Sequence, residues 1–461
     1  MTAPASASSS RGSFGSRVGF ILAAAGSAVG LGNIWRFPYA AGENGGAAFV
    51  MVYLGFVFLC GIPVLLAELA LGRQTKANPV GAFEKIAPGS KWKLVGALGV
   101  VTGFCILAFY CVVAGWTLSY LGRALVGTFG GAFGAEQSNA LFQTIISDPR
   151  ECIATTVVFL VLTGLVVRGG IGGGIERWSK ILMPMLFAIL IVLAIRSLTL
   201  PGAEEGLRFL LHFDPSELSG KAAMSALGQA LFSLSLGMGG MITYGSYLAR
   251  RENLAVAGVA VAIADTSVAI LAGLIVFPAL FSTGHEPSSG PGLVFQVLPG
   301  IFHTLPAGNL FAIAFYALLA IAALTSTISL LEVVVAYFVD ERRWTREKAV
   351  WIIVTAAALV AVPSALSQGA SDTFTSFVAG KSFLDLQNIV WGNLSLSFGA
   401  LLIAVFVAYR WGIDRAEREL ATGRPGGVDW FVRAWSLLLR FVCPISIAGV
   451  FVYLLVTGEF L

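Results

Sequence analysis

The chain has 461 residues, of which 57% are hydrophobic and only 12% charged, and its net charge is +4. A soluble protein of this length would carry about twice that share of charge, so the composition excludes a soluble globular domain and indicates an integral membrane protein. The small positive charge lies in short loops, which argues against nucleic acid as a partner.

Residues 1–15 are rich in Ser, Ala and Gly and precede the first apolar segment. No cleavage site follows a short apolar core, so we expect a cytoplasmic N-terminal tail and not a signal peptide. The five cysteines lie mostly inside apolar segments and form no CxxC or Cys/His cluster. This usage predicts neither a metal site built on cysteine nor a disulfide framework.

Residues 28–39, with the sequence AVGLGNIWRFPY, interrupt an apolar segment that runs from about residue 18 to residue 58. Glycine weakens a helix and frees backbone groups from its hydrogen-bond ladder. At membrane depth an open backbone is tolerated only where it is buried in protein or lines a watery cavity. A polar hairpin between two spans is the alternative, but a hairpin would gather its polar residues at one end. The pattern favours a helix broken at membrane depth, with free backbone groups for a ligand.

Hydropathy predicts about eleven spans of helical length. They cover residues 17–41, 46–73, 92–124, 152–168, 177–199, 222–249, 254–283, 306–340, 346–364, 383–412 and 430–457. Basic residues concentrate in the loops after even-numbered spans, so the positive-inside rule predicts a cytoplasmic N-terminus and an extracytoplasmic C-terminus. Residues 82–88 and 209–218 are expected to form short surface helices. The sequence thus predicts an all-α, multi-pass protein of the inner (plasma) membrane of the cell.

A second interruption, FSLSLGMGG at residues 232–240, falls in the sixth predicted span. Each interrupted span opens a unit of five spans, and an odd number of spans per unit inverts the second unit relative to the first. Paired breaks in inverted halves point to a transporter's binding site at the membrane midplane. Small residues also serve plain helix packing, which would be the preferred explanation of the second break alone. As a matched pair, the two breaks favour a site.

Several polar side chains lie within spans. The hydroxyls of Thr325, Ser326 and Thr327 could face the break in the first span, or they could bond back to their own helix, as is common in membranes. Glu68 and Glu332 are candidate functional residues, because placing an ionisable side chain inside a membrane costs free energy. We expect both to make structural hydrogen bonds to the first or the sixth span.

At the two breaks the sequence resembles the neurotransmitter:sodium symporter family, and specifically its bacterial amino-acid-transporting branch. The likeness covers about residues 11–455. It rests on GNIWRFPY at 32–39 with ENGG at 43–46, GWT at 115–117, QALFSLS at 229–235, TY at 243–244 and LTST at 324–327. The family usually has twelve spans, and the span missing here is peripheral to the transport core.

The resemblance implies a leucine-transporter-like fold, an inverted five-plus-five helix repeat with broken helices 1 and 6. We expect a single transporter core at residues 16–414, made of repeats at 16–199 and 222–414. Residues 428–458 would add a peripheral eleventh transmembrane helix.

The resemblance also implies two sodium sites. Sodium is a hard cation best held by oxygen, and the spans show no cage of carboxylates, so carbonyls and hydroxyls must supply most ligands. The first site would be formed by Ala28 (carbonyl), Asn33, Ser233 and Asp265, with the substrate carboxylate completing the shell. The second would be formed by the carbonyls of Gly26, Val29 and Ala322 and the hydroxyls of Thr325 and Ser326.

By the same resemblance an amino acid would bind between the two breaks. Its carboxylate would meet the Leu31 and Gly32 amides and the Tyr110 hydroxyl, beside a half-helix N-terminus. Its ammonium would meet backbone around Ala25, Gly26, Phe232, Ser233 and Ser235. Its side chain would lie among Ile106, Tyr110, Phe232, Met238, Ser326 and Leu330.

That lining is apolar and adaptable, so it predicts a hydrophobic L-amino acid and would leave a charged side chain unpaired. Gly30 supports the same substrate class. Monoamine-transporting relatives carry an aspartate at this position to pair an amine that lacks a carboxylate.

Gates are expected on either side of the site. Outside, Arg36 lies one turn beyond the break, and Tyr110 and Phe232 would form a lid. Family members often pair this arginine with an aspartate of the tenth span; the aligned residue here is Asn388, and Asp385 one turn earlier could replace it. Inside, Arg11 with Asp340, braced by Phe14 and Tyr247, resembles the family's inner latch, although Phe14 stands where a tryptophan is usual. Arg11 could instead be a merely topogenic charge.

Chloride is not expected as a cofactor. Animal members of the family need it beside the first sodium, held partly by a serine of the seventh span, and here that position is Ala269. One helical turn earlier Asp265 replaces the usual asparagine and supplies a fixed negative charge. The alternative is an aspartate that caps or hydrogen-bonds locally. Asp265 could also take up a proton on the empty return step, which would make transport sensitive to internal pH.

The sequence therefore predicts a sodium-coupled symporter that imports hydrophobic or neutral L-amino acids by alternating access, with spans 1, 2, 6 and 7 rocking against the rest. The expected partners are this substrate and the lipid bilayer. No enzyme is expected, because no Ser/His/Asp set or metal motif lies in a span. The alternatives are a sodium-coupled carrier of osmolytes, such as betaines or GABA-like compounds, and an ion channel, for which neither a repeated filter nor a continuous polar stripe is visible.

Overall fold

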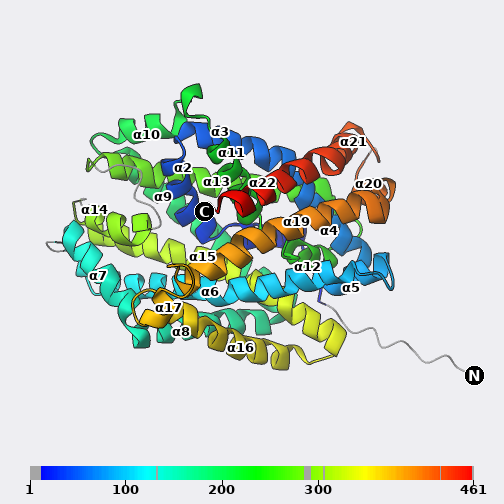
Figure 1. Ribbon diagram of the computed structural model, residues 1–461, viewed down its shortest axis with the longest axis horizontal. Helices are drawn as coiled ribbons and strands as arrows, with labels where there is room; N and C mark the ends of the chain where they lie inside the picture. The colour runs from blue at the N-terminus through cyan, green and yellow to red at the C-terminus, as the bar shows by residue number, and fades with distance from the viewer. Residues whose placement is uncertain (1–11, 131–132, 285–291, 305–306, 426, 459–461) are drawn as a thin grey trace, which may run out of the picture.

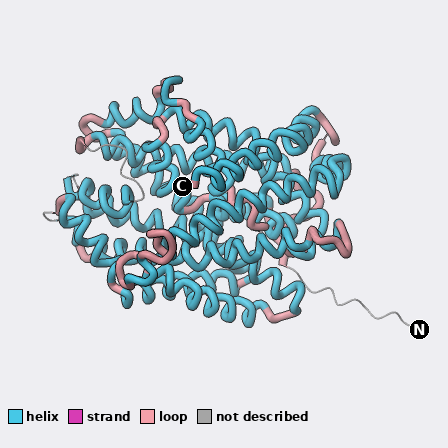
Figure 2. The backbone as a smooth tube through the Cα atoms, viewed as in Figure 1, coloured by secondary structure: helices cyan, strands magenta, loops and turns pink. Residues whose placement is uncertain are grey.

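The computed structural model describes residues 12–130, 133–284, 292–304, 307–425 and 427–458. In this part of the chain every regular element is a helix, apart from one isolated bridge between Val378 and Lys381. Figure 2 shows that the loops gather mainly at the two ends of the helix bundle. The predicted all-α class is confirmed.

Nine helical segments of the described residues are long and apolar enough to cross a membrane, and a bent pair near the front can be counted as a tenth. The first five are Ala47–Thr75 (α3, Ala47–Phe56; η2, Val57–Gly61; α4, Ile62–Thr75), Lys93–Leu125 (α6), Pro149–Arg168 (α8), Ile171–Leu198 (η4, Ile171–Glu176; α9, Arg177–Leu198) and Leu254–Phe281 (α13). The next two are Gly308–Arg342 (α15) and Arg346–Leu366 (α16). The last two are Phe383–Ala421 (α18, Phe383–Gln387; η8, Asn388–Ser395; α19, Leu396–Val405; η9, Phe406–Gly412; α20, Ile413–Ala421) and Trp430–Thr457 (α21, Trp430–Leu437; η10, Leu438–Val442; α22, Cys443–Thr457).

The sixth predicted span, 222–249, is divided into α11 (Gly220–Ser233) and α12 (Gly240–Ser246). Each half is too short to cross a membrane alone. The total of eleven spans, the inverted repeats at 16–199 and 222–414 and the peripheral role of 428–458 stay predictions. Of the expected tail at 1–15, residues 1–11 lie outside the described residues.

The helix of the first predicted span is interrupted and bent within residues 28–39. It consists of α1 (Arg17–Ala28), η1 (Gly32–Arg36) and α2 (Phe37–Glu43), and the two halves are bent by 52°. Val29 leaves the helical conformation with φ −67° and ψ 114°. The Gly30 amide, freed from the helix, donates to Asn33 Oδ1 at 3.0 Å. The break lies inside the protein, because residues 23–34 are all buried.

The second break spans residues 234–239, between α11 and α12. Ser235, Gly237 and Gly239 have φ of 55°, 86° and 75°, in the left-handed region that ends a helix. A Cβ at Gly237 would lie 2.7 Å from the Ala400 backbone nitrogen, so only glycine allows this close approach to α19. The Gly237 amide donates to Glu68 Oε1 at 2.7 Å, which gives Glu68 the structural contact to the sixth span that we expected.

The remaining short helices lie at the ends of the bundle. They are α5 (Pro79–Ile86), η3 (Thr128–Gly130), α7 (Ala135–Ser147), α10 (Ala203–Leu211), η5 (Pro215–Glu217), η7 (Leu293–Val297), α14 (Leu298–Thr304) and α17 (Asp372–Thr375). In Figure 1, α5 and α20 lie at the right-hand end of the bundle, and α7, α10 and α14 lie at the left-hand end. The helix expected at 82–88 begins earlier, because Asn78 Oδ1 accepts from the Gly81 amide and caps it at Pro79. The helix expected at 209–218 is instead α10, followed by the turn η5.

Candidate functional site

A small cavity of about 30 Å³ lies between the two helix breaks. It is lined by backbone and side chains from α1, α6, α11, α15, α19 and both breaks. The residues predicted to bind substrate that line it are Gly30, Gly32, Ile106, Tyr110, Phe232, Ser233, Ser235, Met238, Ser326 and Leu330. Leu31 lines the larger cavity beside it, whereas Ala25 and Gly26 belong to neither lining. Ser27, Ala28 and Leu396 complete the lining.

Side chains satisfy part of the open backbone around this inner cavity. The Leu31 amide donates to the Tyr110 hydroxyl at 2.8 Å, and Ser235 Oγ donates to the Ser27 carbonyl at 2.8 Å. Gln229 Nε2 donates to the Gly32 carbonyl at 2.8 Å. Ser27 Oγ and Gln229 Oε1 are buried and have no hydrogen-bond partner among the described residues. Buried polar atoms without partners are rare, so these two atoms leave hydrogen-bonding capacity for a ligand or water.

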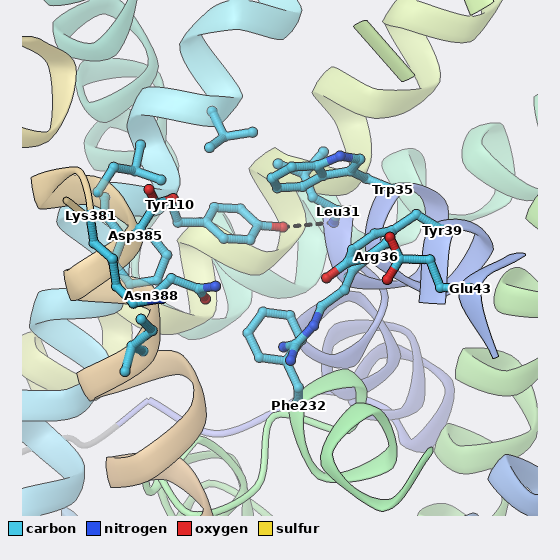
Figure 3. A pocket seen from close by; sticks show the side chains of 15 residues that line it. Leu31, Trp35, Arg36, Tyr39, Glu43, Tyr110, Phe232, Lys381, Asp385 and Asn388 are labelled. Carbon is cyan, nitrogen blue, oxygen red and sulfur yellow. Dashed lines mark hydrogen bonds between the residues drawn. The ribbon is translucent and has the colours of Figure 1, made fainter. Parts of the chain in front are cut away.

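A larger outer cavity of about 340 Å³ adjoins the inner one and shares Gly32, Tyr110 and Phe232 with it. Its further lining includes Arg36, Tyr39, Glu43, Lys381, Asp385 and Asn388. Figure 3 shows Lys381, Asp385 and Asn388 across the cavity from Arg36, Tyr39 and Glu43. Tyr110 and Phe232 therefore form the boundary between the two cavities, where the sequence places the lid.

Arg36 lies at this boundary. Its guanidinium carbon lies 4.4 Å from the centroid of the Phe232 ring, and its Nη2 donates to Asn393 Oδ1 at 2.8 Å. Asp385 accepts a 2.6 Å hydrogen bond from Ser382 Oγ at the start of α18. Arg36 and Asp385 thus have other partners in this structure, and the pairing of Arg36 with Asp385 or Asn388 stays a prediction. Asn393 is a partner that the sequence reasoning missed.

The predicted side-chain ligands of the first sodium converge. Asn33 Nδ2 lies 2.9 Å from Ser233 Oγ and 2.7 Å from Asp265 Oδ1, and Ser233 Oγ donates to Asp265 Oδ2 at 2.7 Å. The Tyr53 hydroxyl lies 3.5 Å from both Ser233 Oγ and Asp265 Oδ2. Ala28 lines the inner cavity beside this cluster. Carboxylate, hydroxyl and amide oxygens are ligands that a hard cation prefers. Asn33 Nδ2 faces the cluster in this structure, so these residues fit sodium once the Asn33 amide turns and its Oδ1 faces the ion.

The predicted ligands of the second sodium also come together. The Val29 carbonyl accepts from Ser326 Oγ at 3.0 Å and from Thr325 Oγ1 at 3.4 Å. The single hydroxyl proton of Thr325 has a nearer acceptor, the Ala322 carbonyl of its own helix at 3.0 Å. A Cβ at Gly26 would lie 3.2 Å from Thr325 Cβ, so α1 and α15 are in close contact here. The hydroxyls of residues 325–327 therefore show both predicted arrangements. Some bond back to carbonyls of α15, and Ser326 bonds across to the break in the first span.

The predicted inner gate lies at the opposite end of α1. Phe14 packs edge-on against Tyr247 and Tyr244, with ring centroids 6.3 and 5.9 Å apart, and the Phe14 amide donates to the Tyr247 carbonyl at 3.4 Å. The Tyr247 hydroxyl donates to Glu332 Oε1 at 2.6 Å, so Glu332, like Glu68, makes a hydrogen bond to the sixth span. Arg11 lies outside the described residues, so its latch with Asp340 stays a prediction.

Asp340 and Glu176 hold the chain around this gate. Asp340 Oδ2 accepts from the Asn78 amide at 3.1 Å. Glu176 Oε2 accepts from the Gly15 amide at 2.7 Å, and its Oε1 accepts from Ser16 Oγ at 3.0 Å. The segment before α1 is therefore tied to η4, a contact that the sequence reasoning did not find.

The sequence analysis did not identify four residues that lie at the site or at its outer gate, because their sequence context gives only weak signals. Tyr53 is one aromatic residue in an apolar run, and Ser27 is one small residue in a helix. Gln229 lies inside a family motif, yet the motif does not say which backbone group it contacts. Asn393 lies in η8, a π-helical stretch that changes the face a residue presents.

Comparisons with known proteins identify the family of this chain. A sequence model of the Sodium:neurotransmitter symporter family matches residues 11–140 and 138–459. The uncharacterized sodium-dependent transporter YhdH of Bacillus subtilis is 42% identical over 442 residues, which are 95% of this chain and 97% of that protein. An uncharacterized sodium-dependent transporter of Haemophilus influenzae is 38% identical over 452 residues, 96% of this chain and 98% of that protein. The crystal structure of MhsT in complex with L-phenylalanine is 46% identical and has a TM-score of 0.89, covering 96% of this chain and 99% of that one.

Proposed function

This chain belongs to the sodium:neurotransmitter symporter family and is a sodium-dependent membrane transporter, not an enzyme; we propose that it imports hydrophobic, neutral L-amino acids together with sodium. The family and the leucine-transporter-like fold class predicted from the motifs are thereby confirmed. The substrate, the two sodium sites and the direction of transport are proposals.

The inner cavity carries the substrate proposal. None of the described residues that line it is charged, so a zwitterion would rely on backbone, hydroxyl groups and sodium for its two charges, and its side chain would have to be neutral. The lining side chains Ile106, Phe232, Met238 and Leu330 favour an apolar one. The likeness to MhsT, which was crystallised with L-phenylalanine, supports the same class.

Substrate binding would be coupled to the outer gate. About 30 Å³ is less room than an aromatic side chain needs, so Phe232 or Met238 would have to move as the substrate enters. Phe232 also stacks under Arg36, so a change at the ring reaches the outer cavity. The outer cavity is wide, whereas Phe14 and Tyr247 pack the opposite end of α1. This arrangement supports an outward-facing state of an alternating-access cycle.

Sodium would bind at two places. Asn33, Ser233 and Asp265 with the Ala28 carbonyl would hold one ion beside the substrate carboxylate. Val29, Ala322, Thr325, Ser326 and the Gly26 carbonyl would hold the other and join α1 to α15. A carboxylate that is also a sodium ligand links the two affinities, because each ligand then raises the affinity for the other.

Two finer proposals rest on the sequence. Chloride is not required, because Asp265 carries a fixed negative charge in the first sodium set and Ala269 offers no hydroxyl. The end that holds Phe14, α5 and α20 faces the cytoplasm, because basic loops favour that side, and the membrane is the plasma membrane.

Uptake into proteoliposomes tests the proposed function. Purified full-length protein should accumulate labelled leucine or phenylalanine under an inward sodium gradient and not when choline replaces sodium. Hydrophobic amino acids should compete, whereas lysine, glutamate, betaine and GABA should not. Competition by betaine or GABA alone would support the osmolyte carrier instead, and a sodium flux that does not saturate would support a channel.

A further inference from the structure

Two surface cavities of about 370 and 390 Å³ lie beside α20, far from the transport site. Both are lined by Ile86 of α5 and by Trp411, Arg415 and Arg418. They lie at the end of the bundle that holds α5 and α20 (Figure 1). The shared residues make the two cavities one continuous basic pocket.

The charge of this basic pocket is not neutralised by the protein. Arg410 and Lys85 also line it, and these two residues, Arg415 and Arg418 are all exposed. Within the described chain, no carboxylate lies within ion-pair distance of Arg410, Arg415 or Arg418. Of the acidic residues in the lining, Asp414 is exposed, and Glu419 is bound to Arg73.

The Arg73–Glu419 pair holds α20 in place. Arg73, at the end of α4, is fully buried, and its Nε lies 2.6 Å from Glu419 Oε1. Ala416 and Leu420 are buried on the same side of α20. Gly412 has φ of 96° and turns the chain between η9 and α20. One side of α20 is therefore fixed to the bundle, and its other side presents arginines to the surroundings.

Aromatic residues place the basic pocket at the depth of lipid headgroups. Trp411 lines it, Tyr409 is 54% exposed, and Trp430, at the start of the next span, is 78% exposed. Tyr and Trp gather at the membrane–water interface, where their rings lie at headgroup level. Positive side chains at that level lie next to lipid phosphates.

We propose that this basic pocket binds the phosphate of an anionic phospholipid in the leaflet at this face, which is the cytoplasmic leaflet in the proposed orientation. Arginine binds phosphate through paired N–H donors, and basic pockets between helices on the cytoplasmic side suit such headgroups. A free phosphate would be held poorly, because exposed charges are screened by salt. A lipid phosphate is concentrated at this depth by the bilayer itself.

The test compares two arginine pairs in full-length protein purified in detergent. Arg415→Gln with Arg418→Gln removes two charges from the basic pocket. Arg177→Gln with Arg342→Gln removes two exposed charges elsewhere. Binding of dioctanoyl-phosphatidylglycerol, dioctanoyl-phosphatidylcholine and inorganic phosphate is measured by native mass spectrometry. A sodium-dependent melting transition verifies the fold of each variant.

We expect the unmodified protein to prefer phosphatidylglycerol to phosphatidylcholine, and the Arg415/Arg418 variant to bind phosphatidylglycerol about tenfold or more weakly. The Arg177/Arg342 variant should keep its affinity. Equal weakening in both variants, or none in the first, would overturn the proposal. Displacement of the lipid by an equal concentration of inorganic phosphate would show a free-phosphate site instead.

Discussion

The Leu31 amide donates a 2.8 Å hydrogen bond to the Tyr110 hydroxyl at the boundary between the inner and outer cavities. Both groups are predicted to meet the substrate carboxylate, and in this structure the Leu31 N–H donates to the Tyr110 oxygen instead. A carboxylate that enters would accept from the amide and from the hydroxyl together. The pair is therefore arranged to exchange one internal hydrogen bond for two bonds to substrate.

Tyr110→Phe should weaken substrate binding about tenfold or more, because hydrogen bonds to charged groups contribute about 1.5–3 kcal/mol. Substrate-dependent thermal stabilisation in sodium measures the affinity. Tyr316→Phe is the control, since Tyr316 is a buried tyrosine whose hydroxyl donates to the Val294 carbonyl outside the site. An unchanged affinity in Tyr110→Phe would mean that the carboxylate binds elsewhere.

Thr325→Val combined with Ser326→Ala removes the two hydroxyls that reach the Val29 carbonyl. The apparent sodium affinity should fall at least tenfold, which corresponds to about 1.4 kcal/mol. Sodium activation of uptake measures it. Thr327→Val is a matched control in the same run, because the Thr327 hydroxyl contacts Thr163 at 2.8 Å and not the break. Unchanged sodium activation in the folded double variant would rule out the second site.

Gly30→Asp should abolish amino-acid uptake. A Cβ at Gly30 would lie 2.7 Å from the Tyr110 hydroxyl and closer still to Ser326 Oγ, so the new carboxylate would stand where the substrate carboxylate is expected, and like charges repel strongly in a low dielectric. Gly30→Asn has nearly the same size without the charge and should lose less affinity. Retained leucine or tryptophan uptake in Gly30→Asp would show that the site is misplaced.

Glu419→Ala should destabilise the protein by about 3 kcal/mol or more, because it leaves the fully buried Arg73 guanidinium without its carboxylate. Glu417→Ala, two residues earlier on α20, removes a half-buried carboxylate with no ion pair among the described residues and should cost little. Melting in detergent compares the two. Equal melting temperatures would mean that Arg73 finds another partner.

The two helix breaks beside the inner cavity could be predicted from the sequence pattern alone. Gly30, Gly32, Ser233 and Ser235 of its lining lie in or beside two short breaks of otherwise apolar spans, and an open backbone at membrane depth limits what the breaks can do. Tyr110 and Ser326 lie on the unbroken helices α6 and α15, and their place in the site came from the family resemblance. Gly30, Asn33 and Ser233 all belong to these breaks or their edges. The assignment of Asn33 and Ser233 to a sodium ion still needed the family resemblance, because a hydroxyl such as that of Ser233 in a membrane helix usually bonds to its own backbone.

The outer gate was harder to predict because it depends on helical register. Counting in turns from Asn388 leads back to Asp385, but the structure has a π-helical stretch, η8, that begins at Asn388. Such a stretch adds a residue to the turn and rotates the next part of the helix, and Asn393 then reaches Arg36. No local sequence pattern predicts a contact between Arg36 and Asn393, which are 357 residues apart in the chain.

The chloride prediction depends on Asp265. Its Oδ1 accepts from Asn33 Nδ2 and its Oδ2 accepts from Ser233 Oγ, each at 2.7 Å, so its carboxylate lies within the proposed first sodium site and is not merely a local cap. Ala269, one turn further along α13, is fully buried and offers no hydroxyl to an anion. Uptake should therefore be the same in chloride and in gluconate.

The double variant Asp265→Asn with Ala269→Ser tests whether the charge of Asp265 makes uptake independent of chloride. It removes the fixed negative charge and restores a hydroxyl one turn away, so uptake should fall in gluconate and recover in part when chloride is added. Ala269→Ser alone keeps the carboxylate and should stay indifferent to chloride, which makes it the matched control. A clear loss of uptake by the unmodified protein in gluconate would contradict the prediction. If uptake by the double variant is equal in chloride and in gluconate, the sodium ion needs neither the Asp265 carboxylate nor a chloride ion beside it. The charge of Asp265 would then not be the reason why transport is independent of chloride.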